Sequence, residues 1–286
     1  MIITLKVFSL KNNINEITRC DTYYKSDAKS SPFVLLLHGF RAFSSWGFFP
    51  YFATKLAENN FIAGCLDFSL NTISDKEKQW FDMDRFRKNT VTQMITESKM
   101  LIEHLGDYEE IAKRWNGDVY IMGHSLGGAL AIAVTDSIND NQKQIVKKIV
   151  TICSISDIDI YNIKQKEKWE ELGYKEFFDS NTDQNIILDV DFLRDRLTYT
   201  AERSLASMIS RLNVPTYFIH TEADVTVPPK SLDIISASFS DKLLLKTELI
   251  PKANHLLNCE HPFKGTNNAL EQIVNNTISF YRTSSF

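Results

Sequence analysis

The chain carries the pattern Gly-His-Ser-Leu-Gly at residues 123–127, which is a G-x-S-x-G motif centred on Ser125. An apolar run precedes the motif and a run of small residues follows it, so we expect a strand, a sharp turn and a helix. Glycine on either side removes side chains that would collide with the backbone of such a turn. Ser125 would then project at the helix N-terminus, where backbone N–H groups and the helix dipole stabilise negative charge. The motif therefore predicts a nucleophilic serine.

A serine hydroxyl needs a base to take its proton, and the base needs an acid to orient it. On a sheet of this kind the chain order is serine, acid, histidine. We expect His255 to be the base, because it follows the last predicted strand in a loop that can reach the serine. His261 is the alternative base. His220 ends an apolar run and is expected to be structural.

The acid is expected after the strand predicted at 214–220, where the sequence reads Thr-Glu-Ala-Asp-Val-Thr-Val-Pro. Asp224 is the predicted acid, because the turn before Val-Pro places it at the carboxyl end of that strand. Glu222 is the alternative, and its other interpretation is a solvated loop carboxylate. Asp67 ends an earlier strand and is expected to cap a turn or line the pocket.

The oxyanion that forms during acyl transfer needs two N–H donors. One is expected from Leu126, the residue after the nucleophile, and the other from the loop that follows the strand at 33–38. Gly39 allows a close backbone approach there, so the N–H of Phe40 is the predicted second donor. Arg41 follows directly and is predicted to be a surface arginine rather than a contact for an acidic substrate.

The composition describes a globular enzyme-sized chain: 286 residues, 43% hydrophobic and 24% charged. A net charge of −4 gives no basic footprint for nucleic acid. No apolar run approaches the ~20 residues of a membrane helix, and the first ten residues favour a strand over a signal peptide. The four cysteines are scattered without zinc-ligand spacing, and those at 65 and 153 are expected to be buried thiols. We therefore expect a cytoplasmic protein with no partner in nucleic acid or membrane; monomer and homodimer stay open.

Strands are predicted at 2–9, 15–25, 33–38, 61–67, immediately before Ser125, and at 145–153, 214–220 and 243–250. Helices are predicted at 50–59, 85–105, after Ser125, and at 229–238 and 268–282. Alternating strands and helices imply an open, mostly parallel sheet in a single domain, residues 1–286. The charged segment 157–212 interrupts the alternation of strands and helices and is expected to form a small cap of two or three helices. Four of its aromatic residues are expected to pack the cap rather than face substrate: Trp169, Tyr174, Phe177 and Phe178.

Together, these residues resemble the α/β-hydrolase superfamily over nearly the whole chain. The segment 38–50, the pair Asn254-His255 and the later His-Pro-Phe at 261–263 are similar to bacterial dienelactone-hydrolase-like or prolyl-oligopeptidase-like hydrolases. The resemblance implies an eight-stranded sheet and hydrolysis of carboxylic esters through an acyl-serine, with no metal or organic cofactor. Dienelactone hydrolase itself uses a cysteine nucleophile, so Ser125 argues against that reaction. Oligopeptidases carry a propeller domain, for which this chain has no room.

The sequence therefore predicts a serine hydrolase of small-molecule carboxylic esters with short-chain or aromatic acyl groups. A hydrolase of small peptides or amides on the same fold is one alternative. A non-catalytic ligand-binding protein is the other, since fold alone does not determine function.

Overall fold

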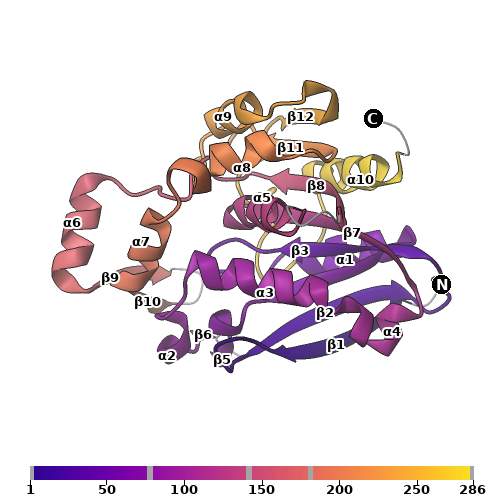
Figure 1. The fold of residues 1–286 in the computed structure, drawn as a ribbon, viewed down its shortest axis with the longest axis horizontal. Helices are drawn as coiled ribbons and strands as arrows, with labels where there is room; N and C mark the ends of the chain where they lie inside the picture. Colours follow the sequence, from indigo (N-terminus) through magenta and orange to yellow (C-terminus); the bar gives the residue numbers. More distant parts are fainter. Residues whose placement is uncertain (1–2, 76–79, 140–143, 180–182, 284–286) are drawn as a thin grey trace.

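The computed structural model describes residues 3–75, 80–139, 144–179 and 183–283 (Figure 1). An eight-stranded sheet runs through the molecule in the order β1-β2-β4-β3-β7-β8-β11-β12. Strands β1 and β2 pair antiparallel, as do β2 and β4, and the remaining neighbours are parallel. The strands are β1 (Ile3–Lys11), β2 (Ile17–Lys25), β3 (Ser31–Leu37), β4 (Ile62–Asp67), β7 (Trp115–His124), β8 (Val146–Ile152), β11 (Thr216–Thr221) and β12 (Leu245–Ile250).

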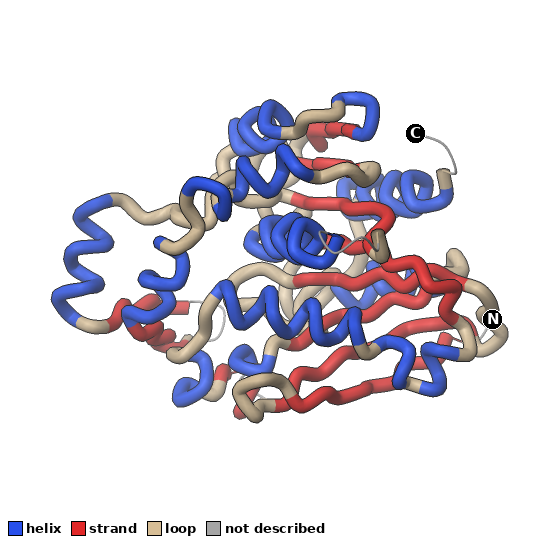
Figure 2. Tube along the Cα trace, viewed as in Figure 1, coloured by secondary structure: helices blue, strands red, loops and turns tan. Residues whose placement is uncertain are grey.

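This sheet confirms the predicted fold class and its eight strands, apart from residue 2, which lies outside the described residues. Helices cover both faces, as Figure 2 shows, and each face has its own hydrophobic core. One core is covered by α1 (Phe49–Glu58) and α10 (Asn268–Arg282). The other is covered by α3 (Val91–Glu103), α5 (Leu126–Asn139), α8 (Leu205–Arg211) and α9 (Lys230–Ser238). Central strands are apolar without alternation because both of their faces are buried.

The predicted helix at 85–105 is shorter than expected, and a separate element precedes it. A short helix α2 (Met83–Phe86) comes first, and α3 then begins after Thr90. The Thr90 side chain accepts a hydrogen bond from the N–H of Gln93, an N-cap that fixes the start of the helix. Short elements that the sequence did not reveal are β5 (Ile73–Asp75), β6 (Trp80–Phe81) and α4 (Glu109–Ala112).

The segment between β8 and β11 extends from one end of the sheet (Figure 1). We call residues 157–212 the insertion. It contains α6 (Ile163–Leu172), β9 (Tyr174–Asp179), β10 (Gln184–Asp189), α7 (Val190–Leu197) and α8. The described part of the insertion thus holds three α-helices, within the expected two or three, and also an antiparallel pair of strands, β9 and β10, that was not expected. The reason is local: the two strands alternate between more and less exposed side chains, which is the period of a strand.

Aromatic side chains hold the insertion together. Trp169 is buried, and its Nε1 donates a hydrogen bond to the carbonyl of Leu188 at 3.2 Å. Its ring stacks on Phe192. By contrast, Tyr174 and Phe178 are exposed. No helix among the described residues is long and apolar enough to cross a membrane.

Candidate active site

Ser125 occupies a tight turn between β7 and α5. Its φ is +57°, a left-handed conformation that is strained for a side chain other than glycine. A Cβ added at Gly123 would lie 2.0 Å from the carbonyl oxygen of Gly127. One added at Gly127 would lie 2.1 Å from the carbonyl oxygen of Leu37. Both motif glycines are therefore needed because backbone from two other elements closes around the serine.

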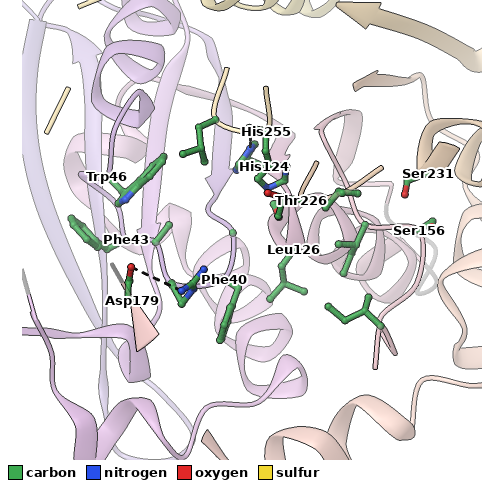
Figure 3. Close-up of a pocket in the computed structure, with 18 of the residues that line it drawn as sticks. Phe40, Phe43, Trp46, His124, Leu126, Ser156, Asp179, Thr226, Ser231 and His255 are labelled. Atoms are coloured by element: carbon green, nitrogen blue, oxygen red, sulfur yellow. Dashed lines mark hydrogen bonds and ion pairs between the residues drawn. The ribbon is translucent and has the colours of Figure 1, made fainter. Parts of the chain in front are cut away.

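His255 and Asp224 form a hydrogen-bonded pair beside the same turn. The Nδ1 of His255 lies 2.7 Å from Oδ2 of Asp224, and both side chains are buried. The other carboxylate oxygen, Oδ1, accepts the N–H groups of Thr226 at 2.9 Å and Val227 at 2.8 Å. His255 and Ser125 line one cavity of about 580 Å³. Figure 3 shows this cavity with His255 and Leu126 labelled in its lining. The structure thus brings together the three residues predicted as nucleophile, base and acid.

The charge state of Asp224 determines what His255 can do. Burial alone would raise the pKa of Asp224, but hydrogen bonds from His220, His255 and the N–H of Val227 outweigh it and hold the pKa well below its ordinary value. The ionised carboxylate accepts a hydrogen bond from the Nδ1–H of His255. The lone pair of His255 is therefore left on Nε2, which is the atom that a general base uses.

A second histidine, His124, contacts His255. Its Nε2 lies 2.8 Å from the backbone carbonyl oxygen of His255, and the two rings are 4.8 Å apart. Burial is the main cause that lowers the pKa of His124 to about 3, so the ring is neutral and Nε2–H is the donor. His124 thereby anchors the loop that carries His255, the predicted base, without placing a positive charge beside it. The sequence assigned His124 no role of its own.

Two backbone N–H groups are placed next to Ser125. A Cβ added at Gly39 would lie 3.0 Å from the Cβ of Ser125, so the loop after β3 lies directly against the serine. Within the described part of the chain, the N–H of Phe40 has no hydrogen-bond partner. Leu126 is the first residue of α5, where N–H groups have no partner inside the helix. Both residues line the cavity, and their role as oxyanion donors stays a prediction.

The ring of Phe40 is held by the insertion as well as by the body. Its centroid lies 5.8 Å from that of Phe177 and 5.8 Å from that of Phe192, both in the insertion. A third contact, at 5.9 Å, is with Phe86 of α2. The predicted oxyanion donor therefore belongs to an aromatic cluster that joins two parts of the fold.

The alternative acids have other partners. The carboxylate of Glu222 is exposed and accepts the N–H of Lys252 at 3.1 Å. That of Asp67 accepts the N–H of Ser44 at 2.8 Å, so it holds the loop after β3. Neither is hydrogen-bonded to His255, whose Nδ1 is engaged by Asp224.

The other two downstream histidines also have structural contacts. The Nδ1 of His261 accepts the N–H of Gly47 at 2.9 Å, and its ring stacks on Trp46 while lining the cavity. His220 is fully buried, and its Nε2 lies 2.9 Å from the carbonyl oxygen of Val227. These contacts fix the walls around His255.

Two groups of side chains that could bind a metal lie here. One is His124, Cys153 and His255, and the other is Cys153, His220 and Asp224. Their atoms are already engaged: the thiol of Cys153 is hydrogen-bonded to Thr221, and the imidazoles have the partners given above. Burial also raises the pKa of Cys153 to about 12, so the thiol keeps its proton. This donor set suits a hydrogen-bonded network better than a metal site. All four cysteines are buried, including the two predicted.

The insertion contributes polar residues to the cavity that sequence reasoning missed, namely Tyr161, Asp179 and Arg196. Nothing in the charged insertion sequence distinguishes them from its surface residues. Arg41, predicted to be a surface arginine, has a side chain that is 37% exposed, but it also lines the cavity and lies 4.0 Å from Asp179. A dashed line at Asp179 in Figure 3 marks this ion pair. The φ of Arg41 is +60°.

Residues 20–162, half of the chain, match the phospholipase/carboxylesterase family. The chain belongs to this family. It is an α/β hydrolase that acts on esters, in agreement with the resemblance seen in the sequence. A search of curated proteins finds no match.

Solved structures of this fold cover almost the whole chain at low identity. Est1E from Butyrivibrio proteoclasticus with ferulic acid bound has a TM-score of 0.72 and 16% identity, over 96% of this chain and 97% of its own. A hydrolase from Agrobacterium vitis has a TM-score of 0.73 and 13% identity, over 98% and 99%. Dienelactone hydrolase from Anabaena variabilis has a TM-score of 0.62 and 13% identity, over 98% and 97%. At this identity the likeness shows the fold.

Proposed function

We propose that the protein is a serine hydrolase that cleaves carboxylic esters through an acyl-serine intermediate. The observation that carries this proposal is the 2.7 Å bond between His255 and the ionised Asp224, in the cavity that Ser125 lines. A buried carboxylate that fixes one tautomer of a buried histidine is the arrangement that a general base requires. A pure binding site has no need of it.

In the proposed reaction, Nε2 of His255 takes the proton of Ser125 as its Oγ attacks the ester carbonyl. The negative charge on the carbonyl oxygen is held by the N–H groups of Phe40 and Leu126. The imidazolium then gives its proton to the departing alcohol, and an acyl-serine remains. Water attacks the acyl group with His255 again as base, which releases the acid and restores the serine.

The substrate class we propose is a small ester with a short-chain or aromatic acyl group. Aromatic side chains from the body line the cavity and suit such a group: Phe40, Phe43, Trp46 and Phe81. Est1E, which has the same fold, binds ferulic acid. We also propose that the insertion is a cap on a single domain, because Tyr161, Asp179 and Arg196 form one wall of the cavity. A cytoplasmic location is proposed from four free, buried thiols.

The test is hydrolysis of p-nitrophenyl esters from acetate to long acyl chains and cinnamate, by wild type and Ser125→Ala. We expect turnover in the wild type and at least a ~10³-fold loss in the variant. Ser156→Ala is the matched control, since Ser156 also lines the cavity and has no role in the reaction. Turnover that survives in Ser125→Ala would overturn the mechanism. A p-nitroanilide series distinguishes an amide hydrolase from an esterase.

A further inference from the structure

Arg196 is a buried cation in the wall of the cavity. It lies on α7 of the insertion, lines the cavity with Ser125 and is 2% exposed. Its Nε donates to the carbonyl oxygen of Ile158 at 2.6 Å. Its Nη2 is buried and has no hydrogen-bond partner among the described residues.

A buried guanidinium normally has a carboxylate partner, because an uncompensated buried charge is strongly destabilising. No ion pair with Arg196 occurs within the described ranges, and the carboxylates nearest along the chain have other partners. Asp159 pairs with Lys166, and Asp195 accepts hydrogen bonds from Thr92. The nearby charges of Asp159, Asp195 and Asp157 act on Arg196, but within the described ranges no carboxylate forms an ion pair with it, and its Nη2 has no partner.

Aromatic rings stabilise Arg196 in part and leave a polar edge. Its Cζ lies 5.4 Å from the ring centroid of Tyr161 and 5.2 Å from that of Phe192. Tyr161 also lines the cavity, and its hydroxyl makes no hydrogen bond in the described part of the chain. The second cation of the cavity, Arg41, is held by Asp179 at 4.0 Å, which is too long for a bidentate pair. Two arginines thus face one aspartate in the cavity.

We propose that the cavity binds esters that carry a carboxylate, and that Arg196 receives this group. The proposal rests on the proposed esterase function and specifies its substrate class. The Arg196 guanidinium matches a planar carboxylate, the Tyr161 hydroxyl can donate a further bond, and Arg41 adds positive charge. The aromatic walls suit the apolar part of the substrate.

The test compares esters that differ in one charge. The first pair is mono-p-nitrophenyl adipate and its methyl ester, in which the carboxylate lies on the acyl side. Adipate is long enough to disfavour attack of the free carboxylate on its own ester. The second pair is 4-(hexanoyloxy)benzoate and its methyl ester, in which the carboxylate lies on the alcohol side. We expect wild type to prefer the anionic member of one pair by at least about tenfold in kcat/KM.

Variants assign the preference to Arg196. In Arg196→Met the preference should vanish while the neutral ester is still hydrolysed, and Arg196→Lys should retain part of it. Arg194→Met is the matched control, because Arg194 lies on the same helix, is exposed and pairs with Glu170. That control should keep the full preference. If Arg196→Met does not fold, the carboxylate site is judged from the ratio of kcat/KM for the anionic and neutral esters, measured in wild type and in Arg41→Gln.

The outcomes separate this inference from the function on which it rests. Equal kcat/KM within both pairs, with turnover of neutral esters that depends on Ser125, overturns the carboxylate site and leaves the esterase intact. No Ser125-dependent turnover of any ester overturns both. A preference that Arg196→Met retains and Arg194→Met loses also refutes the assignment.

Discussion

Replacing Asp224 by asparagine changes one atom next to His255 and leaves most of the site in place. The amide oxygen can still accept the N–H groups of Thr226 and Val227, which lie 2.9 and 2.8 Å from Oδ1. The amide NH₂ then takes the place of Oδ2, 2.7 Å from Nδ1 of His255. Since that NH₂ is a donor, Nδ1 must become the acceptor, and the ring proton moves to Nε2. The lone pair that should take the Ser125 proton is lost.

The magnitude follows from the tautomer and not from the fold. In serine proteases the equivalent change lowers kcat by about 10⁴-fold, or about 5.5 kcal/mol of transition-state stabilisation. The loss of one charge-assisted hydrogen bond lowers the free energy of unfolding by about 1.5–3 kcal/mol. Asp224→Asn should therefore be folded and almost inactive, with KM nearly unchanged.

The assay is steady-state hydrolysis of p-nitrophenyl butyrate at pH 7.5, with circular dichroism to show that each variant is folded. Glu222→Gln is the matched control, because Glu222 is the other carboxylate after β11 and is exposed. It should keep kcat within about twofold of the wild type. A folded Asp224→Asn that retains more than about a tenth of the wild-type kcat would refute the reasoning. Loss of activity in Glu222→Gln would move the acid to that residue.

Three further predictions concern the scaffold. Gly123→Ala and Gly127→Ala should each give unfolded or insoluble protein, because the new Cβ would lie 2.0 or 2.1 Å from a backbone oxygen; a soluble, active variant would contradict this close packing. Lys148→Met should lower the free energy of unfolding in urea by about 2–3 kcal/mol without changing kcat, because the Nζ of Lys148 donates to three carbonyls at the end of α10; an unchanged midpoint would contradict that role. The free energy of unfolding should also fall as the pH drops from 6.5 toward 4. Burial lowers the pKa of His38 to about 4, and burial is also the largest cause that lowers the pKa of His124 to about 3. Both stay neutral in the fold while they gain protons in the unfolded chain, which removes about 2 kcal/mol for each by pH 5; urea midpoints that do not change between pH 7.5 and 5 would contradict this.

The parts of the site that could be predicted are those that the backbone dictates. Gly123 and Gly127 are required by steric overlap at a turn, so their spacing marks Ser125 directly. The central strands are continuous apolar runs because both of their faces are covered, which makes them recognisable in the sequence alone. His255 and Asp224 follow because the carboxyl ends of parallel strands meet at one edge of the sheet.

The parts that could not be predicted depend on how the insertion packs. Arg196 is one of several charged residues in a charged segment, and nothing in its neighbours separates a buried guanidinium from exposed ones such as Arg194. The strands β9 and β10 are short and rich in polar residues, so their alternation is weak evidence before their pairing is known. The contact of Arg41 with Asp179 could not be predicted for the same reason, since Asp179 lies in the insertion.

The position of Phe40 has a consequence for how this enzyme can change. Phe40 follows Gly39, which lies against Ser125, while its ring is packed against Phe177 and Phe192 of the insertion. The segment that shapes the substrate cavity therefore also supports a group proposed to stabilise the transition state. Substrate selectivity and catalytic rate therefore depend on the same segment of the fold. An insertion taken from another protein would bring its own pocket shape, but it would also need an aromatic pair that packs against Phe40. New specificities are therefore reached more readily by substitutions along the cavity wall than by exchange of the whole segment.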